Sequence, residues 1–447
     1  MTLPSPLAGH VEALRQRPIA ATDKGFGPLA ARRQVSAASL AAARPPLHEA
    51  GLSYPLLTLR ESALTHNVDA MAAYCLAAGV GLAPHGKTTM APQLAARQLA
   101  AGAWGITVAT IGQLQTYRTF GVPRLLLANE LVDPAGIAWL AGQLNTEENL
   151  EVLCYVDSAD GVALLDRHLR QHTLARPLPV LVELGHARGR TGARTHGEAL
   201  AVADAAARTS TLDVAGVAGY EGGLGHRADP ATLERVAAYC RALRALADGL
   251  HVAGLTSDRP ILTAGGSAYF DVVVAELTAA GRSSAGRSSA GRSAVQPRVI
   301  LRSGCYVTHD HGFYAGISPA VRDTAVGLTL RPAFELWAPV LSRPEPGLAL
   351  LGAGRRDVSF DAGLPVPLRV RTREHGTRPG AEAPDAMKVT ALNDQHAYLT
   401  VPDDSGLRPG DLVSLGISHP CTTFDKWRAI PVVDDADHIT DVIHTFF

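Results

Sequence analysis

Residues 80–88 read VGLAPHGKT and join a short apolar run to a lysine. The run, Val80–Ala83, is apolar rather than alternating, which is typical of a strand buried on both faces. Lys87 follows where such a strand would end. Because burial of an ammonium group is costly, this position indicates either an amine with a chemical task, such as forming a Schiff base, or a side chain that emerges into solvent.

Seven further apolar runs follow, each ending in polar or glycine residues and each followed by a helical pattern. Asp133-Pro134 and Asp229-Pro230 each provide an N-cap and a proline at the first helical position. Eight strand–helix units over about 250 residues predict a closed α/β barrel of the (β/α)8, TIM-like type. The alternative, a doubly wound open sheet, usually carries a GxGxxG loop after its first strand, and none follows the early runs. The seven runs are 105–109, 124–128, 150–156, 178–182, 214–218, 260–263 and 298–301.

The 447 residues exceed one typical core, so we expect more than one domain. Residues 1–50, rich in Ala, Pro and Arg, are predicted to be an N-terminal extension, residues 51–314 the barrel, and residues 315–447 a β-rich domain. The Gly/Arg/Ser repeat at 280–293 is typical of a surface insertion. The strands predicted for the β-rich domain are 325–330, 333–341, 368–372, 387–392, 396–401 and 412–417.

Composition excludes several classes of protein. The formal net charge is −1, without a basic tract, which argues against a nucleic-acid partner. The five cysteines are scattered and form no CxxC pair, as expected of reduced thiols in the cytoplasm. No run reaches the roughly 18 apolar residues of a membrane-spanning helix, and no signal-peptide pattern is present. We therefore expect a cytoplasmic protein without a membrane partner.

Residues that follow the later runs would lie at the barrel mouth, where barrel active sites are found. Gly265, Gly266 and Ser267 follow the seventh run, and their backbone N–H groups could hold a phosphate. Arg190 follows the fifth run and could meet an anionic oxygen. Tyr220 follows the sixth and offers a phenol. Each of these also has a purely structural interpretation, because glycine turns and polar loops are common.

Two short segments contain metal-ligand residue types. His419 and Cys421 form a His-x-Cys pair, and imidazole and thiolate both suit zinc. Two protein ligands are too few for a closed structural site but suit an open catalytic one. The second segment is His309-Asp310-His311, for which polar residues lining a domain junction are an equally good interpretation.

The motifs PHGKT at 84–88, GRTG at 189–192, YEG at 220–222, GGS at 265–267 and HPC at 419–421 resemble, in this order, the D-serine dehydratase and D-threonine aldolase family. This family belongs to the alanine-racemase-like, fold type III group of pyridoxal-phosphate (PLP) enzymes. The resemblance implies PLP and zinc as cofactors and a homodimer. The residues that it implies are Lys87 as the Schiff-base lysine, His85, Arg190, Thr191 and Tyr220 around the cofactor, Gly265, Gly266 and Ser267 at its phosphate, and His419 and Cys421 at zinc.

The resemblance also implies an activity: a lyase that dehydrates and deaminates a D-3-hydroxy amino acid, such as D-serine, D-threonine or 3-hydroxyaspartate, to a 2-keto acid and ammonia. Lys87 and Tyr220 are the expected catalytic residues. Cys421 favours a dehydratase, because the resemblance implies a His-x-Cys pair at the metal in the dehydratases and a His-x-Asp pair in the aldolases. Residues 354–360 and 393–396 resemble the bacterial amino-acid deaminase branch. Three alternatives remain: a retro-aldol enzyme that yields glycine and an aldehyde, a racemase, and a PLP-binding protein without turnover.

Overall fold

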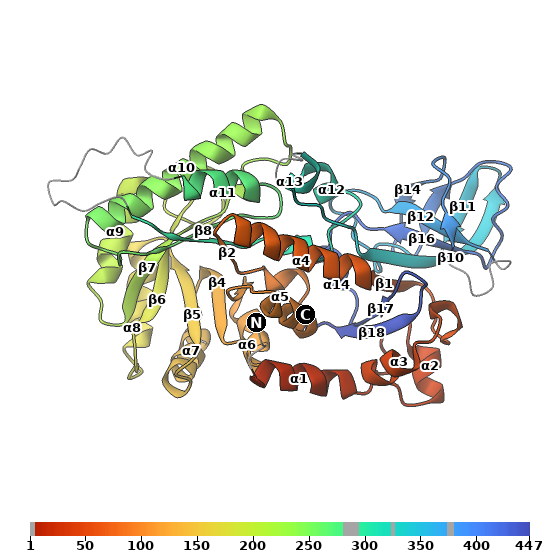
Figure 1. The fold of residues 1–447 in the computed structure, drawn as a ribbon, viewed down its shortest axis with the longest axis horizontal. Coiled ribbons are helices and arrows are strands. Elements are labelled where there is room, and N and C mark those ends of the chain that lie inside the picture. The colour runs from red at the N-terminus through yellow and green to blue at the C-terminus, as the bar shows by residue number, and fades with distance from the viewer. Residues whose placement is uncertain (1–4, 280–294, 323–326, 373–379) are drawn as a thin grey trace.

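The computed structural model describes residues 5–279, 295–322, 327–372 and 380–447 (Figure 1). The Gly/Arg/Ser repeat at 280–293 lies outside these residues. Two sheets organise the chain: an eight-stranded parallel sheet and a ten-stranded sheet, which lie at opposite ends of the molecule in Figure 1.

The parallel sheet has the strand order β2-β9-β8-β7-β6-β5-β4-β3. Its first and last strands are joined by hydrogen bonds from the Trp104 N–H to the Leu82 carbonyl (2.6 Å) and from the Thr107 N–H to the Pro84 carbonyl (3.0 Å), so the sheet closes into a barrel. The predicted barrel and its eight strand runs are confirmed. The strands are β2 (Gly81–Leu82), β3 (Ile106–Val108), β4 (Arg124–Glu130), β5 (Glu151–Val156), β6 (Leu178–Leu184), β7 (Leu212–Gly219), β8 (Ile261–Ala264) and β9 (Arg298–Leu301).

Helices cover the outside of the barrel, and two begin where the sequence predicts. The Asp133 carboxylate accepts the Gly136 N–H at 2.8 Å, and the Asp229 carboxylate accepts the Thr232 N–H at 2.8 Å, so both aspartates cap the helices that follow. The helices are α4 (Glu61–Ala77), α5 (Pro92–Ala100), α6 (Ile111–Thr119), α7 (Pro134–Thr146), α8 (Ala159–Leu169), α9 (His196–Ala207), α10 (Pro230–Val252) and α11 (Phe270–Thr278).

The second sheet is mostly antiparallel and has the path β13-β12-β16-β10-β1-β17-β18. Off this path, β11 pairs with β10, β15 with β11, and β14 with β15. Of the strands predicted for this region, 325–330 begins outside the described residues, and its described part, 327–330, has no regular structure. The strands are β10 (Phe334–Glu345), β11 (Leu348–Leu351), β12 (Val366–Arg371), β13 (Ala381–Glu382), β14 (Lys388–Leu392), β15 (Ala397–Thr400), β16 (Leu412–Gly416), β17 (Ala429–Val433) and β18 (Ile439–His444).

Strand β1 (Leu56–Arg60) lies in the range predicted for the barrel, but it belongs to the second sheet. Leu57 pairs with Leu336 in antiparallel β10, and Leu59 pairs with Val432 in parallel β17. Residues 56–59 are buried, which suits an interior strand of either sheet. Their pairing with the distant strands β10 and β17 is what places them in the second sheet. The chain therefore enters the second sheet, builds the barrel and then returns.

The N-terminal extension packs on the same sheet. Helices α1 (Ser5–Gln16), α2 (Gly27–Arg32) and α3 (Ala37–Ala43) lie below the second sheet and the barrel in Figure 1. Phe26, Leu40 and Leu47 form one buried cluster with Trp337 of β10 and Val442 of β18. The extension is therefore part of the core of the second sheet.

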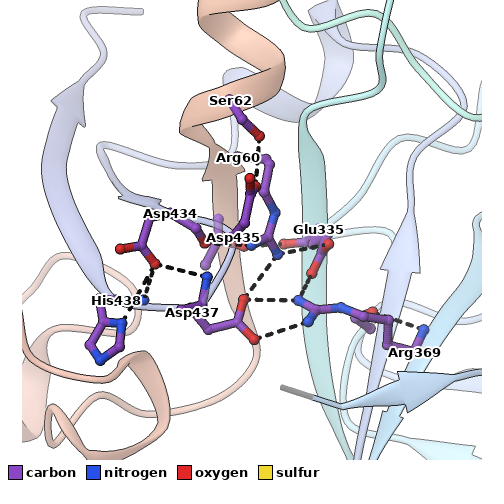
Figure 2. A network of polar contacts seen from close by, with 11 residues as sticks. Arg60, Ser62, Glu335, Arg369, Asp434, Asp435, Asp437 and His438 are labelled. Atoms are coloured by element: carbon purple, nitrogen blue, oxygen red, sulfur yellow. Dashed lines mark hydrogen bonds and ion pairs between the residues drawn. The ribbon is translucent and has the colours of Figure 1, made fainter. Parts of the chain in front are cut away.

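Four charged side chains lock β1 into this sheet (Figure 2). The Arg60 guanidinium lies 3.0 Å from the Glu335 carboxylate and 2.9 Å from that of Asp437. Arg369 of β12 pairs with the same two carboxylates, at 2.9 Å from Asp437. Burial alone would raise the pKa of Asp437, but the hydrogen bond and charge of Arg369, with those of Arg60, hold it below its ordinary value. Two cations and two anions thus neutralise one another within this network.

Within the described ranges, none of the helices combines the length and the apolar character needed to cross a bilayer.

Candidate active site

Lys87 lies at the barrel mouth in a 3-10 turn, η2 (Gly86–Thr88), that follows β2. The turn is held by Tyr117, whose hydroxyl donates to the Gly86 carbonyl at 2.9 Å. A Cβ atom added to Gly86 would lie 2.5 Å from the Tyr117 ring. The glycine of the PHGK sequence is therefore required by packing, and it fixes the position from which Lys87 projects.

His85 precedes this turn and lies among positive charges. Burial lowers the pKa of His85 well below its ordinary value, and the charges of Lys87, Arg302 and Arg190 lower it further. The imidazole is therefore neutral. Its Nδ1 atom is buried and has no hydrogen-bond partner among the described residues. An uncharged ring with a free polar atom, close to three cations, fits an anionic ligand with polar substituents.

Two predicted site residues, Arg190 after β6 and Tyr220 after β7, meet on one side of the mouth. The Arg190 guanidinium lies over the Tyr220 ring, 4.7 Å from its centroid. The Tyr220 N–H donates to the Tyr239 hydroxyl at 3.0 Å, which fixes the backbone there. Burial raises the pKa of the Tyr220 phenol, and the Glu221 charge adds to this. Tyr220 therefore keeps its proton. Thr191, next to Arg190, is exposed.

The glycine turn after β8 is occupied by a carboxylate. The Gly265 N–H donates to Glu221 Oε2 at 3.0 Å, and the Gly266 N–H donates to Glu221 Oε1 at 2.6 Å. These are two of the groups that the sequence assigns to a phosphate. Glu221 is fully buried, and these hydrogen bonds satisfy both oxygens of its carboxyl group. Ser267 accepts the Cys305 N–H at 3.3 Å and so links this turn to the next one.

His419 and Cys421 lie beside the barrel mouth, and a third residue of a metal-ligating type, Cys305, lies next to them. The sulfur of Cys305, from the turn η4 (Cys305–Val307) after β9, lies 3.6 Å from that of Cys421. The donor atoms of Cys305, His419 and Cys421 all lie within 4.8 Å of one another. Contact with Cys305 lowers the pKa of Cys421 well below that of an ordinary thiol, against the effect of burial, and His419 lowers it further. This donor set suits a zinc-like ion.

The imidazole of His419 is oriented by a carboxylate. Its Nδ1 lies 2.7 Å from Asp361 Oδ2, and Asp361 Oδ1 accepts the Thr422 hydroxyl at 2.7 Å. Burial lowers the pKa of His419, but the contacts with Cys421 and Asp361 outweigh this effect and raise the pKa to about 9. A carboxylate on one ring nitrogen leaves the other, Nε2, to face an ion, which is the common arrangement of metal-binding histidines.

One residue connects the lysine turn to the thiols. The hydroxyl of Thr88 lies 3.4 Å from the Cys421 sulfur and 3.9 Å from the Cys305 sulfur. Gly304 permits this approach, because a Cβ atom there would lie 2.6 Å from the His85 carbonyl oxygen and 2.8 Å from the Thr88 hydroxyl. The candidate site is therefore built from segments of both sheets. It contains Lys87, His85 and the three residues of metal-ligating types.

The sequence did not identify Cys305 as a candidate ligand. The available signal was its position directly after the eighth strand, at the mouth. The other predicted cluster, His309-Asp310-His311, has a structural role in the described chain. Asp310 accepts N–H groups of Gly312, Tyr314 and Ala315 and so fixes the loop that leads into α12 (Phe313–Ile317).

A group of three acidic residues lies at the C-terminal ends of β4, β5 and β6. Carboxylate oxygens of Glu130, Asp157 and Glu183 lie within 4.8 Å of one another. Burial raises the pKa of Glu130 to about 8, and the charges of Glu183 and Asp157 add to this. Asp157 accepts the Gly192 N–H at 3.0 Å, next to Thr191. The group therefore retains a proton near neutral pH and supports the loop that carries Arg190.

Comparison with known sequences matches residues 59–278 to the family "Alanine racemase, N-terminal domain" and residues 333–433 to the family "Putative serine dehydratase domain". The chain is 28% identical to a D-threonine aldolase from an Arthrobacter species over 367 residues, which are 79% of this chain and 88% of the aldolase. It is 25% identical to a 3-hydroxy-D-aspartate aldolase from Paracoccus denitrificans over 328 residues, which are 72% and 77% of the two chains.

Solved structures share the fold. The D-threonine aldolase from Filomicrobium marinum superposes with a TM-score of 0.72 at 23% identity, over 88% of this chain and 95% of that one. The D-threo-3-hydroxyaspartate dehydratase from Delftia sp. HT23 superposes with a TM-score of 0.69 at 20% identity, over 90% and 99%. Because both sequence families match in order and the whole architecture is shared, the chain belongs to the alanine-racemase-like, fold type III family of PLP enzymes, as its sequence motifs predicted.

Proposed function

We propose that this protein is a PLP- and zinc-dependent lyase that converts a D-3-hydroxy amino acid, with D-serine as the reference substrate, to a 2-keto acid and ammonia. The observation that carries the proposal is the contact between the turn of Lys87 and the candidate metal-ligand residues. Lys87 is followed by Thr88, whose hydroxyl contacts the Cys421 sulfur at 3.4 Å. The residue next to a candidate Schiff-base lysine therefore contacts a cluster that can hold a metal ion.

The residues present fit PLP. Lys87 would form the Schiff base, Arg190 and His85 would face the polar edge of the ring, and Tyr220, with Thr191 beside it, would line the same side. Since Glu221 already accepts the N–H groups of Gly265 and Gly266, the phosphate would need other donors of this turn, such as the Ser267 hydroxyl. When bound, PLP supplies an electron sink for negative charge at the substrate α-carbon.

The residues also fit zinc. His419 and Cys421 offer a nitrogen and a sulfur, and Asp361 orients the imidazole. When bound, the ion supplies a Lewis acid for the β-hydroxyl, which is otherwise a poor leaving group. Support for a metal comes also from a relative: a structure of D-threo-3-hydroxyaspartate dehydratase with one cysteine replaced by alanine is a metal-free form.

Two side chains have different roles in the proposed proton transfer. Lys87 Nζ would remove the α-proton of the substrate as a general base. Tyr220 keeps its phenolic proton because burial raises its pKa, so it serves as a hydrogen-bond donor and not as a base. Loss of the α-proton and the β-hydroxyl removes water, and the 2-aminoacrylate that leaves hydrolyses to the keto acid and ammonia.

A second candidate is retro-aldol cleavage to glycine and an aldehyde. It is favoured by the names of both curated relatives described above, which are aldolases. The two reactions differ in the bond that breaks at the substrate β-carbon. The dehydratase breaks the Cβ–O bond, and the aldolase breaks the Cα–Cβ bond. The His-x-Cys pair, which resembles the dehydratases, supports the first candidate.

The deciding experiment incubates the PLP-loaded protein with D-serine, D-threonine and D-threo-3-hydroxyaspartate and measures ammonia, keto acid, glycine and aldehyde. Each reaction is repeated after treatment with a chelator and after zinc is restored. We expect ammonia and keto acid in equal amounts, lost on chelation and recovered with zinc. Glycine and aldehyde alone would establish the aldolase. Full turnover in stripped protein would remove the metal from the mechanism.

A further inference from the structure

Cys305 has no role in the proposed reaction, although its thiol is buried against the metal-ligand pair. It is 5% exposed and comes from the barrel, whereas His419 and Cys421 come from the second sheet. The three residues are brought together by the fold and not by the sequence, since 116 positions separate the two cysteines. A buried thiol aimed at two other ligands needs a physical explanation.

The distance between the two sulfurs supplies one. A disulfide would place them about 2.05 Å apart, and the observed separation is 3.6 Å. Two thiolates bound to one tetrahedral zinc ion, each at about 2.3 Å, lie about 3.8 Å apart. The observed distance therefore matches that of two sulfurs that share a tetrahedral ion. The imidazole of His419 completes three donors within 4.8 Å of one another.

The surroundings of Cys305 hold it in this position. The Cys305 N–H donates to the Ser267 hydroxyl at 3.3 Å, which fixes the start of η4. The Thr88 hydroxyl lies beside both sulfurs, 3.4 Å from that of Cys421 and 3.9 Å from that of Cys305, where it can donate to a thiolate. Such outer contacts are typical of metal sites, in which the ligands are themselves oriented by hydrogen bonds.

We propose that Cys305 is a third protein ligand of the metal ion, so that the site is a Cys2His site with one open coordination position. This inference rests on the proposed metal at His419 and Cys421 and goes beyond it in two ways. Two thiolates select a zinc-like ion over magnesium or manganese, which prefer oxygen ligands. Three protein ligands also leave a single position, which is the pattern of catalytic zinc sites, so that the substrate hydroxyl must replace the last water.

The test counts sulfur atoms at the metal. The full-length, PLP-loaded protein is stripped with a chelator, reloaded with one equivalent of zinc and measured by X-ray absorption spectroscopy at the zinc edge. We expect two sulfur neighbours at about 2.3 Å in the unaltered protein. Cys305→Ser and Cys421→Ser should each show one. Cys75→Ala, which changes a buried thiol on α4, is the matched control and should keep two.

A competition titration measures the affinity in parallel. Loss of an outer-shell partner typically weakens metal binding by about 10- to 100-fold. Cys305→Ser should weaken zinc binding by more than this, whereas Cys75→Ala should leave the affinity unchanged. Circular dichroism and the PLP absorption band verify that each variant is folded.

The outcomes separate the two proposals. One sulfur in the unaltered protein would overturn the role of Cys305 and leave the metal at His419 and Cys421 in place, and this measurement needs no variant. Zinc affinity unchanged in a folded Cys305→Ser protein would overturn it as well. If the unaltered protein binds no zinc, both the proposed metal and the third ligand fail.

Discussion

Two polar clusters of this molecule differ in whether their own residues neutralise one another. The network of Arg60, Glu335, Arg369 and Asp437 places two cations against two carboxylates, and the nearest pairs lie within about 3 Å (Figure 2). The cluster of Cys305, His419 and Cys421 instead points three electron-pair donors at one another. The first cluster is complete as the chain folds. The second has unused coordinating capacity.

The difference distinguishes a structural from a functional polar cluster without reference to any relative. A buried network whose charges cancel needs nothing more, because every desolvated ion already faces its counter-ion. A buried set of soft donors that converge on one point is satisfied best by a cation. We therefore expect changes in the first cluster to affect stability and changes around the second to affect chemistry.

The largest effect should come from Lys87, on the chemical side of the comparison. Lys87→Ala removes the amine proposed to bind the cofactor and to take the α-proton, so turnover should fall by about 10⁴-fold. The absorption band of the lysine-bound cofactor should disappear, while the unfolding midpoint of the protein without cofactor stays unchanged. Turnover near that of the unaltered protein would remove Lys87 from the mechanism.

The next largest should come from the balanced network. Asp437→Asn keeps the shape of the side chain, which is 3% exposed, but leaves both arginines short of one counter-ion. Breaking a buried pair in this way costs about 3–5 kcal/mol of unfolding free energy, which denaturant titration measures. The native pKa of Asp437 is lowered, so its stabilisation is present above about pH 4 and is lost as the pH falls further.

The variant should therefore show a weaker loss of stability in acid than the unaltered protein. Zinc content and the PLP band should not change. Equal stability of the two proteins at pH 7 would show that the network contributes nothing, and altered zinc content would show that the two clusters are not independent.

A smaller effect is expected from the residue that orients His419. Asp361→Asn removes the negative charge that faces the imidazole Nδ1 at 2.7 Å. Loss of such an outer-shell carboxylate typically weakens metal binding by about 10- to 100-fold, which a competition titration with a zinc chelator detects. Asp425→Asn, which changes an exposed carboxylate on the segment that follows His419, is the control. Equal affinity in both variants would contradict the proposed metal site.

The smallest effect should come from Glu130, which lies with Asp157 and Glu183 in a group of three carboxyl groups. Its pKa is raised from 4.5 to about 8 in the folded protein, so the native state binds a proton that the unfolded state has lost. Its contribution to stability therefore falls as the pH rises from about 4.5 to about 8. Glu130→Gln should match the unaltered protein near pH 4.5 and exceed it by about 1–2 kcal/mol at pH 8, after allowance for partial exposure.

Thermal unfolding across this pH range measures the difference, with Glu148→Gln, an exposed change, as the control. If the advantage of Glu130→Gln is the same at every pH, Glu130 does not hold the extra proton.

Local pattern was sufficient for the barrel but not for the second sheet. All eight parallel strands could be predicted, because strands buried on both faces form continuous apolar runs that need no knowledge of their partners. Strand β1 has a similar run, but its partners are Leu336 and Val432, far along the chain. Nothing within residues 56–60 states which sheet they join, so the sequence placed them in the barrel range.

The same division applies to the site. The sequence motifs indicated Lys87, His419 and Cys421, because each lies in a short recognisable stretch. Cys305 reaches them only through tertiary structure, 116 positions from Cys421. The use of the Gly265 and Gly266 N–H groups by Glu221 was equally hidden, because the bonds join residues 44 and 45 positions apart. Contacts of this range depend on the path of the whole chain.

The position of β1 has a consequence for the synthesis of the protein on the ribosome. Thr58 bonds to Glu335, which is 277 positions later. At about 5–20 residues per second, β1 must wait roughly 15 to 55 seconds for its partner to be synthesised. During that time the nascent chain carries Leu56, Leu57 and Leu59, all fully buried in the finished fold, without their sheet. The barrel can be translated in full before the strand that precedes it finds its place, so this early segment is where a holding chaperone would be needed most.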